Sequence, residues 1–347
     1  MRIGILTFHW GTNYGGVLQA FCLQEYLIQL GYEVKIIDYK PKQYDFSWSQ
    51  IIRHPGVWKN ISRLLAIRKK ESMLAIFRKN YLKTSRRYFF VKEIEEEINK
   101  YDVLISGSDQ VLNPSFTLKG EGGGTSFAYW LGFRQNNIRK IGYSVSFGCE
   151  HYPDKAVSIA SKWVNYFDVI GTREQTGLDI LDQLGYRGTK CVTPDPTILL
   201  GNMIFSKLHI RLPQIHGNYT CIYMLRHEVD FAGNAKYIDE LHHPLTMEEW
   251  LYTIVNAKQI ITNSYHGTIM AVLSHVPFAV LLETGKDSGM NDRFFTLLGH
   301  IGCNERVAAT LGDAISILNK PIDFTNIDSA ISNYREVGEL FLKENLM

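Results

Sequence analysis

Short apolar runs and a longer stretch of helical spacing alternate along the first forty residues. Residues 3–8 and 34–38 are apolar runs of strand length, and apolar side chains recur every three or four positions between residues 20 and 30. This spacing gives a helix one face that can pack on a sheet, and Gly31 suits the end of such a helix. The pattern predicts a β-α-β unit with parallel strands and a right-handed crossover.

The same alternation continues through the second half of the chain. Further strand-like runs lie at residues 103–106, 141–146, 169–170, 219–225, 259–262 and 278–282, and helical spacing returns at 246–256 and 266–275. Two prolines between Thr193 and Thr197 interrupt the pattern, as is typical of a boundary between domains. We therefore predict an α/β protein with two domains that face a cleft.

The chain length agrees with two domains, because single cores usually stop growing at roughly 250 to 300 residues and this chain has 347. We predict an N-terminal α/β domain at 1–190 and a C-terminal α/β domain at 191–325. Residues 326–347 have a helical pattern, and the sequence leaves open whether this helix packs back on the first domain. Residues 51–100 are rich in Lys, Arg and Glu, which predicts a solvated helical insertion, although a lipid- or polymer-contacting surface would have the same composition.

Charge and cysteine usage narrow the class of protein. Lys and Arg total 37 against 35 acidic residues, and this net charge of +2 is too small for nucleic acid to be the main partner. The five cysteines lack the spacing of a zinc site and indicate buried thiols in a reducing compartment; they are Cys22, Cys149, Cys191, Cys221 and Cys303. The first ten residues lack a charged leader and a long apolar run, so we expect a strand there and not a signal peptide. No run reaches the roughly 20 apolar residues that span a membrane. We expect a cytoplasmic protein without a metal.

The first candidate site is the Gly-rich turn Gly11-Thr12-Asn13-Tyr14-Gly15-Gly16, between the first strand and its helix. Open α/β sheets bind ligands outside the carboxyl ends of their strands. Glycine lets a ligand approach the backbone, and the free amides of a helix start favour an anion or a sugar hydroxyl. The alternative is a tight turn that only packs the helix on the strand.

The second candidate is Ser106-Gly107-Ser108-Asp109-Gln110, directly after the apolar residues 103–105 of a predicted strand. The carboxylate of Asp109 would orient or deprotonate a substrate hydroxyl there. The alternative is a helix N-cap, because Ser and Asp accept backbone N–H bonds in that position.

The third candidate is Thr262-Asn263-Ser264-Tyr265-His266-Gly267-Thr268, where a strand runs into a helix. His266 then lies near a helix N-terminus, which attracts phosphate or carboxylate, and becomes a credible acid or base. A lone histidine is more often structural, but the combination of Ser, His and Gly at such a turn favours function.

Three further cationic residues, in two segments, suit anion binding. Arg173 follows the strand at 169–170, and its guanidinium would bind a carboxylate or phosphate in bidentate fashion, unless it is exposed and paired with Glu174. Lys286 and Arg293 belong to a polar loop at 285–293, which would either hold an anion or be merely solvated.

Five segments in this order resemble the polysaccharide pyruvyl transferase family. They are NYGGVLQAFCLQEYL, SGSDQVLNP, TREQTG, PDPTILL and TNSYHGTIMAVLSHVPF, from residue 13 to about 280. The resemblance implies two Rossmann-like domains of the GT-B type. It also implies phosphoenolpyruvate (PEP) as donor, no cofactor, and a sugar of a surface polysaccharide or its lipid-linked precursor as acceptor, with the protein at the inner face of the membrane as one option.

The resemblance also suggests roles for residues. His266 matches the family histidine and Arg173 a PEP-binding arginine, with Ser264, Tyr265, Lys286 and Arg293 as further PEP-binding candidates. Some members carry an arginine at the position of Ser264, so Arg293 or Lys286 would complete the anion site here.

The chemistry needs one acid and one base, for which the candidates are His266 and Asp109. The acceptor-binding candidates are Asn13, Tyr14, Gly15, Gly16, Ser108 and Gln110. A GT-B glycosyltransferase with a nucleotide-sugar donor and a non-catalytic glycan-binding protein are the two alternatives.

Overall fold

Six parallel strands form the first sheet of the computed structural model. The model describes residues 1–41, 44, 57–119, 127–134, 137–225, 229–240 and 242–346, except for the side chains of 57–63 and 286–288. The strands are β1 (Arg2–Leu6), β2 (Glu33–Ile36), β3 (Val103–Ser106), β4 (Arg139–Val145), β5 (Val169–Thr172) and β6 (Thr189–Val192). Their order is β2-β1-β3-β4-β5-β6, so the chain runs to one side of β1 first and then to the other.

The second sheet repeats this topology with five parallel strands. They are β7 (Thr220–Tyr223), β8 (Ala235–Tyr237), β9 (Gln259–Thr262), β10 (Phe278–Leu281) and β11 (Val307–Ala308), in the order β11-β10-β9-β7-β8. The predicted α/β class is confirmed. The strands β6, β8 and β11 were not predicted, because they are short edge strands whose partly exposed positions form no continuous apolar run.

Helices cover the sheets and bury the central strands. The helices are α1 (Tyr14–Gln29), α3 (Val57–Tyr81), α4 (Val91–Ile98), α5 (Pro114–Lys119), α6 (Asp154–Ala160), α7 (Thr176–Gln183), α8 (Pro196–Leu200), α9 (Met203–Lys207), α10 (Met247–Val255), α11 (Tyr265–Leu273), α12 (Asp292–His300), α13 (Leu311–Leu318) and α14 (Phe324–Leu346). The strands β3, β5, β7 and β10 are buried at every position, as expected of parallel strands covered on both faces. The helix α1 packs against α3, α8 and α11, so it joins the two halves of the molecule.

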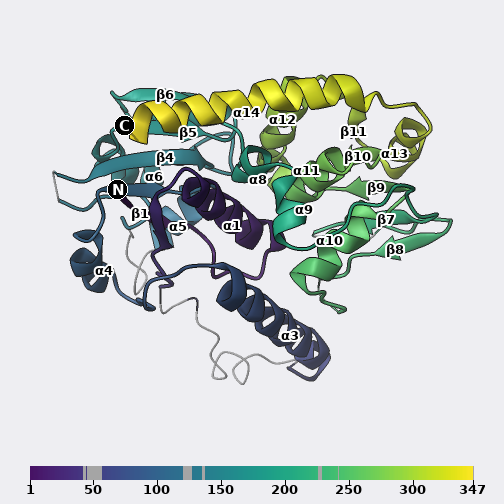
Figure 1. Ribbon diagram of the computed structural model, residues 1–347, viewed down its shortest axis with the longest axis horizontal. Helices are drawn as coiled ribbons and strands as arrows, with labels where there is room; N and C mark the ends of the chain where they lie inside the picture. The colour runs from purple at the N-terminus through teal and green to yellow at the C-terminus, as the bar shows by residue number, and fades with distance from the viewer. Residues whose placement is uncertain are drawn as a thin grey trace.

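The helix α14 extends across both halves (Figure 1). Near its end, Asn345 accepts a hydrogen bond from Arg139 of β4 at 2.8 Å. Further back along the helix, Nε of Arg335 donates to the carbonyl of Ile198 at 3.0 Å. The helix therefore contacts the first sheet, while the domain limits at 190 and 325 remain a prediction.

The helical insertion is less solvated than its composition predicts. Of the predicted segment, residues 51–56 lie outside the described residues, and α3 and α4 account for most of the rest. Leu74 and Phe77 of α3 are core residues, and Lys70 is 3% exposed. Because these side chains share one face of α3, the helix packs on the molecule through that face, while Arg68, Lys69 and Lys79 are exposed on the other.

The thiol and membrane predictions have different outcomes. Cys22, Cys221 and Cys303 are buried, but Cys149 and Cys191 are only half-buried, so the expectation of five buried thiols is wrong for two of them. Within the described part of the chain, no helix is both long and apolar enough to span a membrane.

Candidate functional site

Each sheet has one point at which the strand order reverses, and the candidate turns lie there. In the first sheet the reversal is between β1 and β3, which precede the Gly-rich turn and the turn with Ser108 and Asp109. In the second sheet it is between β7 and β9, and β9 leads to His266. In open α/β sheets such points form the crevice that binds ligands.

The glycines of the first turn provide room for side chains from the other two turns. A methyl group added to Gly15 would lie 2.0 Å from Nδ1 of His266, and one added to Gly16 would lie 2.7 Å from Oδ2 of Asp109. Neither distance is possible for a real side chain, so only glycine permits these approaches. The packing brings Asp109 and His266, 157 positions apart in sequence, against two consecutive residues of α1.

Local hydrogen bonds use some of the predicted acceptor-binding groups. The side chain of Asn13 caps α1 and accepts from the amide of Gly16 at 3.0 Å, although the residue is exposed. The hydroxyl of Tyr14 donates to the carbonyl of Leu245 at 2.6 Å and accepts from its amide at 2.8 Å. Tyr14 therefore links α1 to the second half and has a structural role.

The turn after β3 has a strained backbone. Asp109 has a φ of 79°, in the left-handed region that costs most residues about 1 to 3 kcal/mol. Its Oδ1 accepts from the amide of Gln110 at 2.8 Å, and its carbonyl accepts from the amide of Ser146 at 3.0 Å. These bonds hold the carboxylate beside Gly16, and Gln110 stays half-buried next to it.

The turn after β9 starts α11 through an N-cap. The side chain of Ser264 accepts from the amide of Gly267 at 3.2 Å, so its hydroxyl is used within the turn. Tyr265 and His266 follow in the first helical turn, both buried. The prediction that His266 lies near the start of a helix is confirmed.

Asp195 lies where the candidate residues converge. Its Oδ2 accepts from the hydroxyl of Ser108 at 2.8 Å and lies 3.4 Å from Nε2 of His266 and 3.5 Å from Nη1 of Arg173. Its Oδ1 accepts from the amide and hydroxyl of Thr197 at 2.9 and 2.7 Å. Although burial opposes its charge, His266 and Arg173 hold the pKa of this carboxyl well below its usual value.

Arg173 is buried, which contradicts the alternative of an exposed arginine at a helix start. It is 1% exposed, and its Nε and Nη2 have no hydrogen-bond partner among the described residues. Burial alone would lower the pKa of the guanidinium, but Glu174 and Asp195 raise it above its ordinary value. The side chain is therefore a fixed cation with two unused donor atoms.

Glu174 is held rigidly beside Arg173. Its Oε1 accepts from the hydroxyl of Ser146 at 2.7 Å and from the amides of Phe147 and Gly148 at 2.8 and 3.3 Å. Its Oε2 lies 3.7 Å from Nε of Arg173 and accepts no hydrogen bond from the described residues. The carboxylate thus fixes the position of the guanidinium.

The ring of Tyr265 lies near two guanidinium groups. The Cζ atoms of Arg173 and Arg293 are 4.9 and 5.8 Å from its centroid, within the range of cation–π attraction. Arg293 belongs to α12 and Lys286 to a 3-10 helix at Gly285–Met290, so the predicted loop at 285–293 is largely helical. The side chain of Lys286 lies outside the described residues.

Sequence reasoning did not assign a role to Asp195, and it named Glu174 only as the partner of an exposed Arg173. The pairing is present, but Arg173 is buried. Asp195 lies between two prolines after β6, and Glu174 follows Arg173. An acid at the end of a strand is a signal in both cases, but the convergence of Ser108, Arg173 and His266 on Asp195 depends on tertiary packing.

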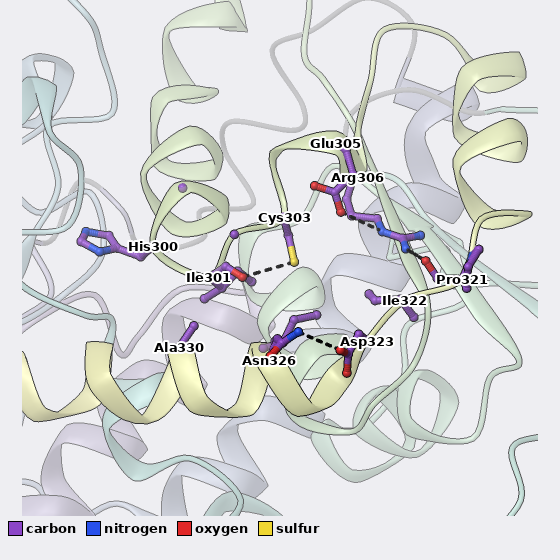
Figure 2. Close-up of a pocket in the computed structure, with 13 residues that line it drawn as sticks. His300, Ile301, Cys303, Glu305, Arg306, Pro321, Ile322, Asp323, Asn326 and Ala330 are labelled. Carbon is purple, nitrogen blue, oxygen red and sulfur yellow. Dashed lines mark hydrogen bonds and ion pairs between the residues drawn. The ribbon is translucent and has the colours of Figure 1, made fainter.

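A separate pocket lies away from these turns (Figure 2). Its volume is about 460 Å³, and α12 and α14 contribute to its lining. The guanidinium of Arg306 is used structurally, because it donates to the carbonyls of Ile317, Lys320 and Pro321. Burial raises the pKa of Cys303 to about 11, so this thiol is unreactive at neutral pH. The described residues contain no group of three His, Cys, Asp or Glu that would hold a metal ion.

Comparisons with known proteins give a family and a fold. Residues 13–283 match the family model described as polysaccharide pyruvyl transferase, whereas no curated protein matches the chain. UDP-GlcNAc 2-epimerase from Neisseria meningitidis, bound to UDP-GlcNAc, is similar with a TM-score of 0.54 and 10% identity, over 97% of this chain and 94% of that one. UDP-GlcNAc 2-epimerase from Methanocaldococcus jannaschii has a TM-score of 0.54 and 12% identity, over 99% of both chains. These likenesses concern the fold alone, and the predicted pair of Rossmann-like units of the GT-B type is confirmed.

Proposed function

This chain belongs to the polysaccharide pyruvyl transferase family, and we propose that it transfers the enolpyruvyl unit of PEP to two hydroxyls of one sugar. The products are a pyruvate ketal and inorganic phosphate. The acceptor would be a surface polysaccharide or its lipid-linked precursor, modified on the cytoplasmic side of the membrane.

The observation that carries this proposal is the convergence of Arg173 and His266 on Asp195. The two side chains follow strands of different sheets, and both are buried. Nε and Nη2 of Arg173 and Nε2 of His266 make no hydrogen bond within the described residues. Buried polar atoms without hydrogen-bond partners are costly, and a carboxylate or phosphate would satisfy the donors of Arg173 and a protonated Nε2 of His266.

Arg173 would hold the carboxylate or phosphate of PEP and spread the charge that develops as phosphate leaves. Such preorganised stabilisation typically contributes several kcal/mol to catalysis. Arg293 is the better-supported second cation, because it shares the ring of Tyr265 with Arg173. Asp195 and Glu174 would act as positioning residues that keep the guanidinium in place.

His266 would be the general acid. Protonation of C3 of PEP gives C2 oxocarbenium character, so a sugar hydroxyl attacks C2 and loses its proton to a base. Asp109 is the candidate base, since its carboxylate lies against Gly16 while His266 lies against Gly15. Departure of phosphate and attack by a second hydroxyl then close the ketal.

The acceptor would bind along the turn of Asn13, Gly15 and Gly16, with Gln110 beside it. Asn13 is exposed and Gln110 half-buried, so a sugar hydroxyl can reach both. Ser108 and Tyr14 are better explained as structural, because their hydroxyls bond to Asp195 and Leu245.

The test is release of phosphate from PEP with a panel of lipid-linked and free glycosides, followed by mass spectrometry of the acceptors. A pyruvate ketal on an acceptor is the expected product. The variant His266→Ala should lose most turnover, and His275→Ala is a matched control, because His275 is exposed just beyond the other end of α11. Arg173→Ala should chiefly raise the apparent KM for PEP.

Two results would reject this proposal. If His266→Ala keeps the turnover of the native protein, the acid is another group. If no acceptor is modified and PEP does not raise the melting temperature, the donor is not PEP.

A nucleotide-sugar donor is the second candidate, because the similar epimerase from Neisseria meningitidis is bound to UDP-GlcNAc. It would be supported by a rise in melting temperature with UDP-GlcNAc but not with PEP.

A further inference from the structure

The two faces of α3 differ in what they contact. Ala66, Leu74 and Phe77 point into the molecule, and so does Lys70, whose Nζ lies 2.5 Å from Oε2 of Glu240. In Figure 1 the helix lies at the lower edge of the molecule, on the side opposite α14. The face turned away from the molecule we call the outer face of α3; it consists of Leu65, Arg68, Lys69, Ser72, Ile76 and Lys79, which recur at helical spacing and are all exposed.

The outer face of α3 combines exposed apolar side chains with cations. Leu65 and Ile76 are each 60% exposed, and Arg68, Lys69 and Lys79 surround them. Glu71 is the single acid between positions 57 and 81, and it pairs with Arg78 at 2.5 Å. Along this helix, the positive charges of Lys69 and Lys79 are therefore not balanced by an acidic side chain.

Basic residues continue beyond the C-terminal end of α3. Lys83, Arg86 and Arg87 are exposed in the connection from α3 to α4. Arg87 pairs with Asp38, and Arg86 lies over the ring of Tyr88. Opposing acids belong to α4, whose Glu93 accepts from the amides of Phe89 and Phe90 at its own helix start.

We propose that the outer face of α3 docks on the surface of an anionic lipid bilayer. Clusters of several Lys and Arg on a helix attract anionic headgroups, at about 1 kcal/mol each, and exposed apolar side chains between them enter the boundary with the acyl chains. A soluble anionic polymer would use the cations but leave Leu65 and Ile76 without a function, so the bilayer explains the face better.

The inner face of α3 connects this surface to the candidate acceptor turn. Nη1 of Arg78 donates to the carbonyl of Gly11 at 3.2 Å, and Nζ of Lys70 lies 4.2 Å from the ring centroid of Tyr14. Docking would therefore set the turn at 11–16 close to the membrane plane, where lipid-linked substrates reside. The docking itself does not depend on the identity of the donor.

The experiment is co-sedimentation of the full chain with vesicles of phosphatidylcholine containing 30% phosphatidylglycerol, at about 0.1 M salt, where electrostatic attraction extends over roughly 10 Å. The protein should bind these vesicles and not vesicles of phosphatidylcholine alone. The double variant Lys69→Glu and Lys79→Glu should lower the partition coefficient about 30-fold or more, since each basic residue contributes about fivefold.

Two variants separate this surface from general charge. Lys162→Glu with Lys343→Glu makes the same change in net charge at exposed positions elsewhere, and it should bind nearly as well as the native protein. The double variant Leu65→Ser and Ile76→Ser should weaken the part of vesicle binding that remains at high salt. All three proteins should keep the native melting temperature, because the substituted side chains are exposed.

The proposal is overturned if the native protein binds neither vesicle or binds both equally. It is also overturned if the control variant loses as much binding as the Lys69 and Lys79 variant, or if soluble heparin binds the protein and anionic vesicles do not.

Discussion

Replacement of Gly15 by alanine tests the packing at the centre of the candidate site. The added methyl group would lie 2.0 Å from Nδ1, 2.3 Å from Cγ and 2.8 Å from Cβ of His266. Ordinary contact begins near 3.4 Å, so the ring must move by 3.4 minus 2.0, or about 1.4 Å. Because the contact includes Cβ, rotation of the ring cannot relieve it, and the side chain must leave its position beside Asp195.

The expected effect on activity is large and the effect on stability small. A displacement of about 1 Å at a reacting group costs roughly 100-fold in rate, so kcat/KM should fall at least 100-fold. Overpacking lowers the free energy of unfolding by about 1 to 3 kcal/mol, and alanine recovers about 0.5 to 1 kcal/mol because it is the better helix residue. The net loss of stability should therefore be at most about 2.5 kcal/mol.

The assays are phosphate release from PEP with the identified acceptor, and urea unfolding. Gly11→Ala is the matched control in the same turn, since the nearest heavy atom to its added methyl group is 4.0 Å away. That variant should retain native activity. Activity of Gly15→Ala within threefold of the native protein, or an equal loss in Gly11→Ala, would refute the reasoning that Gly15 exists to admit His266.

Two further substitutions test the contacts around this site. Asp195→Asn removes one of the two carboxylates that pair with the buried Arg173. The free energy of unfolding at pH 7 should fall, but by less than the roughly 3 to 5 kcal/mol of a fully broken buried pair, because Glu174 remains. The native fold lowers the pKa of Asp195, so the stabilisation by this carboxylate is present above the ordinary carboxyl pKa of about 3.9 and is lost as the pH falls below it. The variant should therefore lose less stability than the native protein between pH 5 and pH 2. An equal loss of stability in both proteins over this range would contradict the prediction. Tyr14→Phe removes both hydrogen bonds to Leu245 and should cost about 1 to 3 kcal/mol in urea unfolding, whereas native stability would show that solvent replaces these bonds at no cost.

Local patterns were sufficient for most elements of the fold. The runs at 103–106 and 259–262 coincide with β3 and β9, because buried parallel strands need continuous apolar side chains. The turns before α1 and α11 were recognisable from their glycines and polar residues, since helix caps and close approaches depend on residue type. The edge strands β6, β8 and β11 carry no such pattern, because partial exposure removes the need for apolar residues.

The composition of the site was decided by tertiary structure. The sequence alone indicated His266, Asp109 and Arg173 as separate candidates, each at the end of a strand. The packing of the two sheets buries Arg173. It also brings Asp195 into contact with Ser108 from the first sheet and with His266 from the second. The charged segment at 51–100 is a second example, because its composition does not reveal which face of α3 packs against the rest of the molecule. Local sequence encodes local backbone preference, whereas burial and pairing between distant residues arise only when the chain has folded.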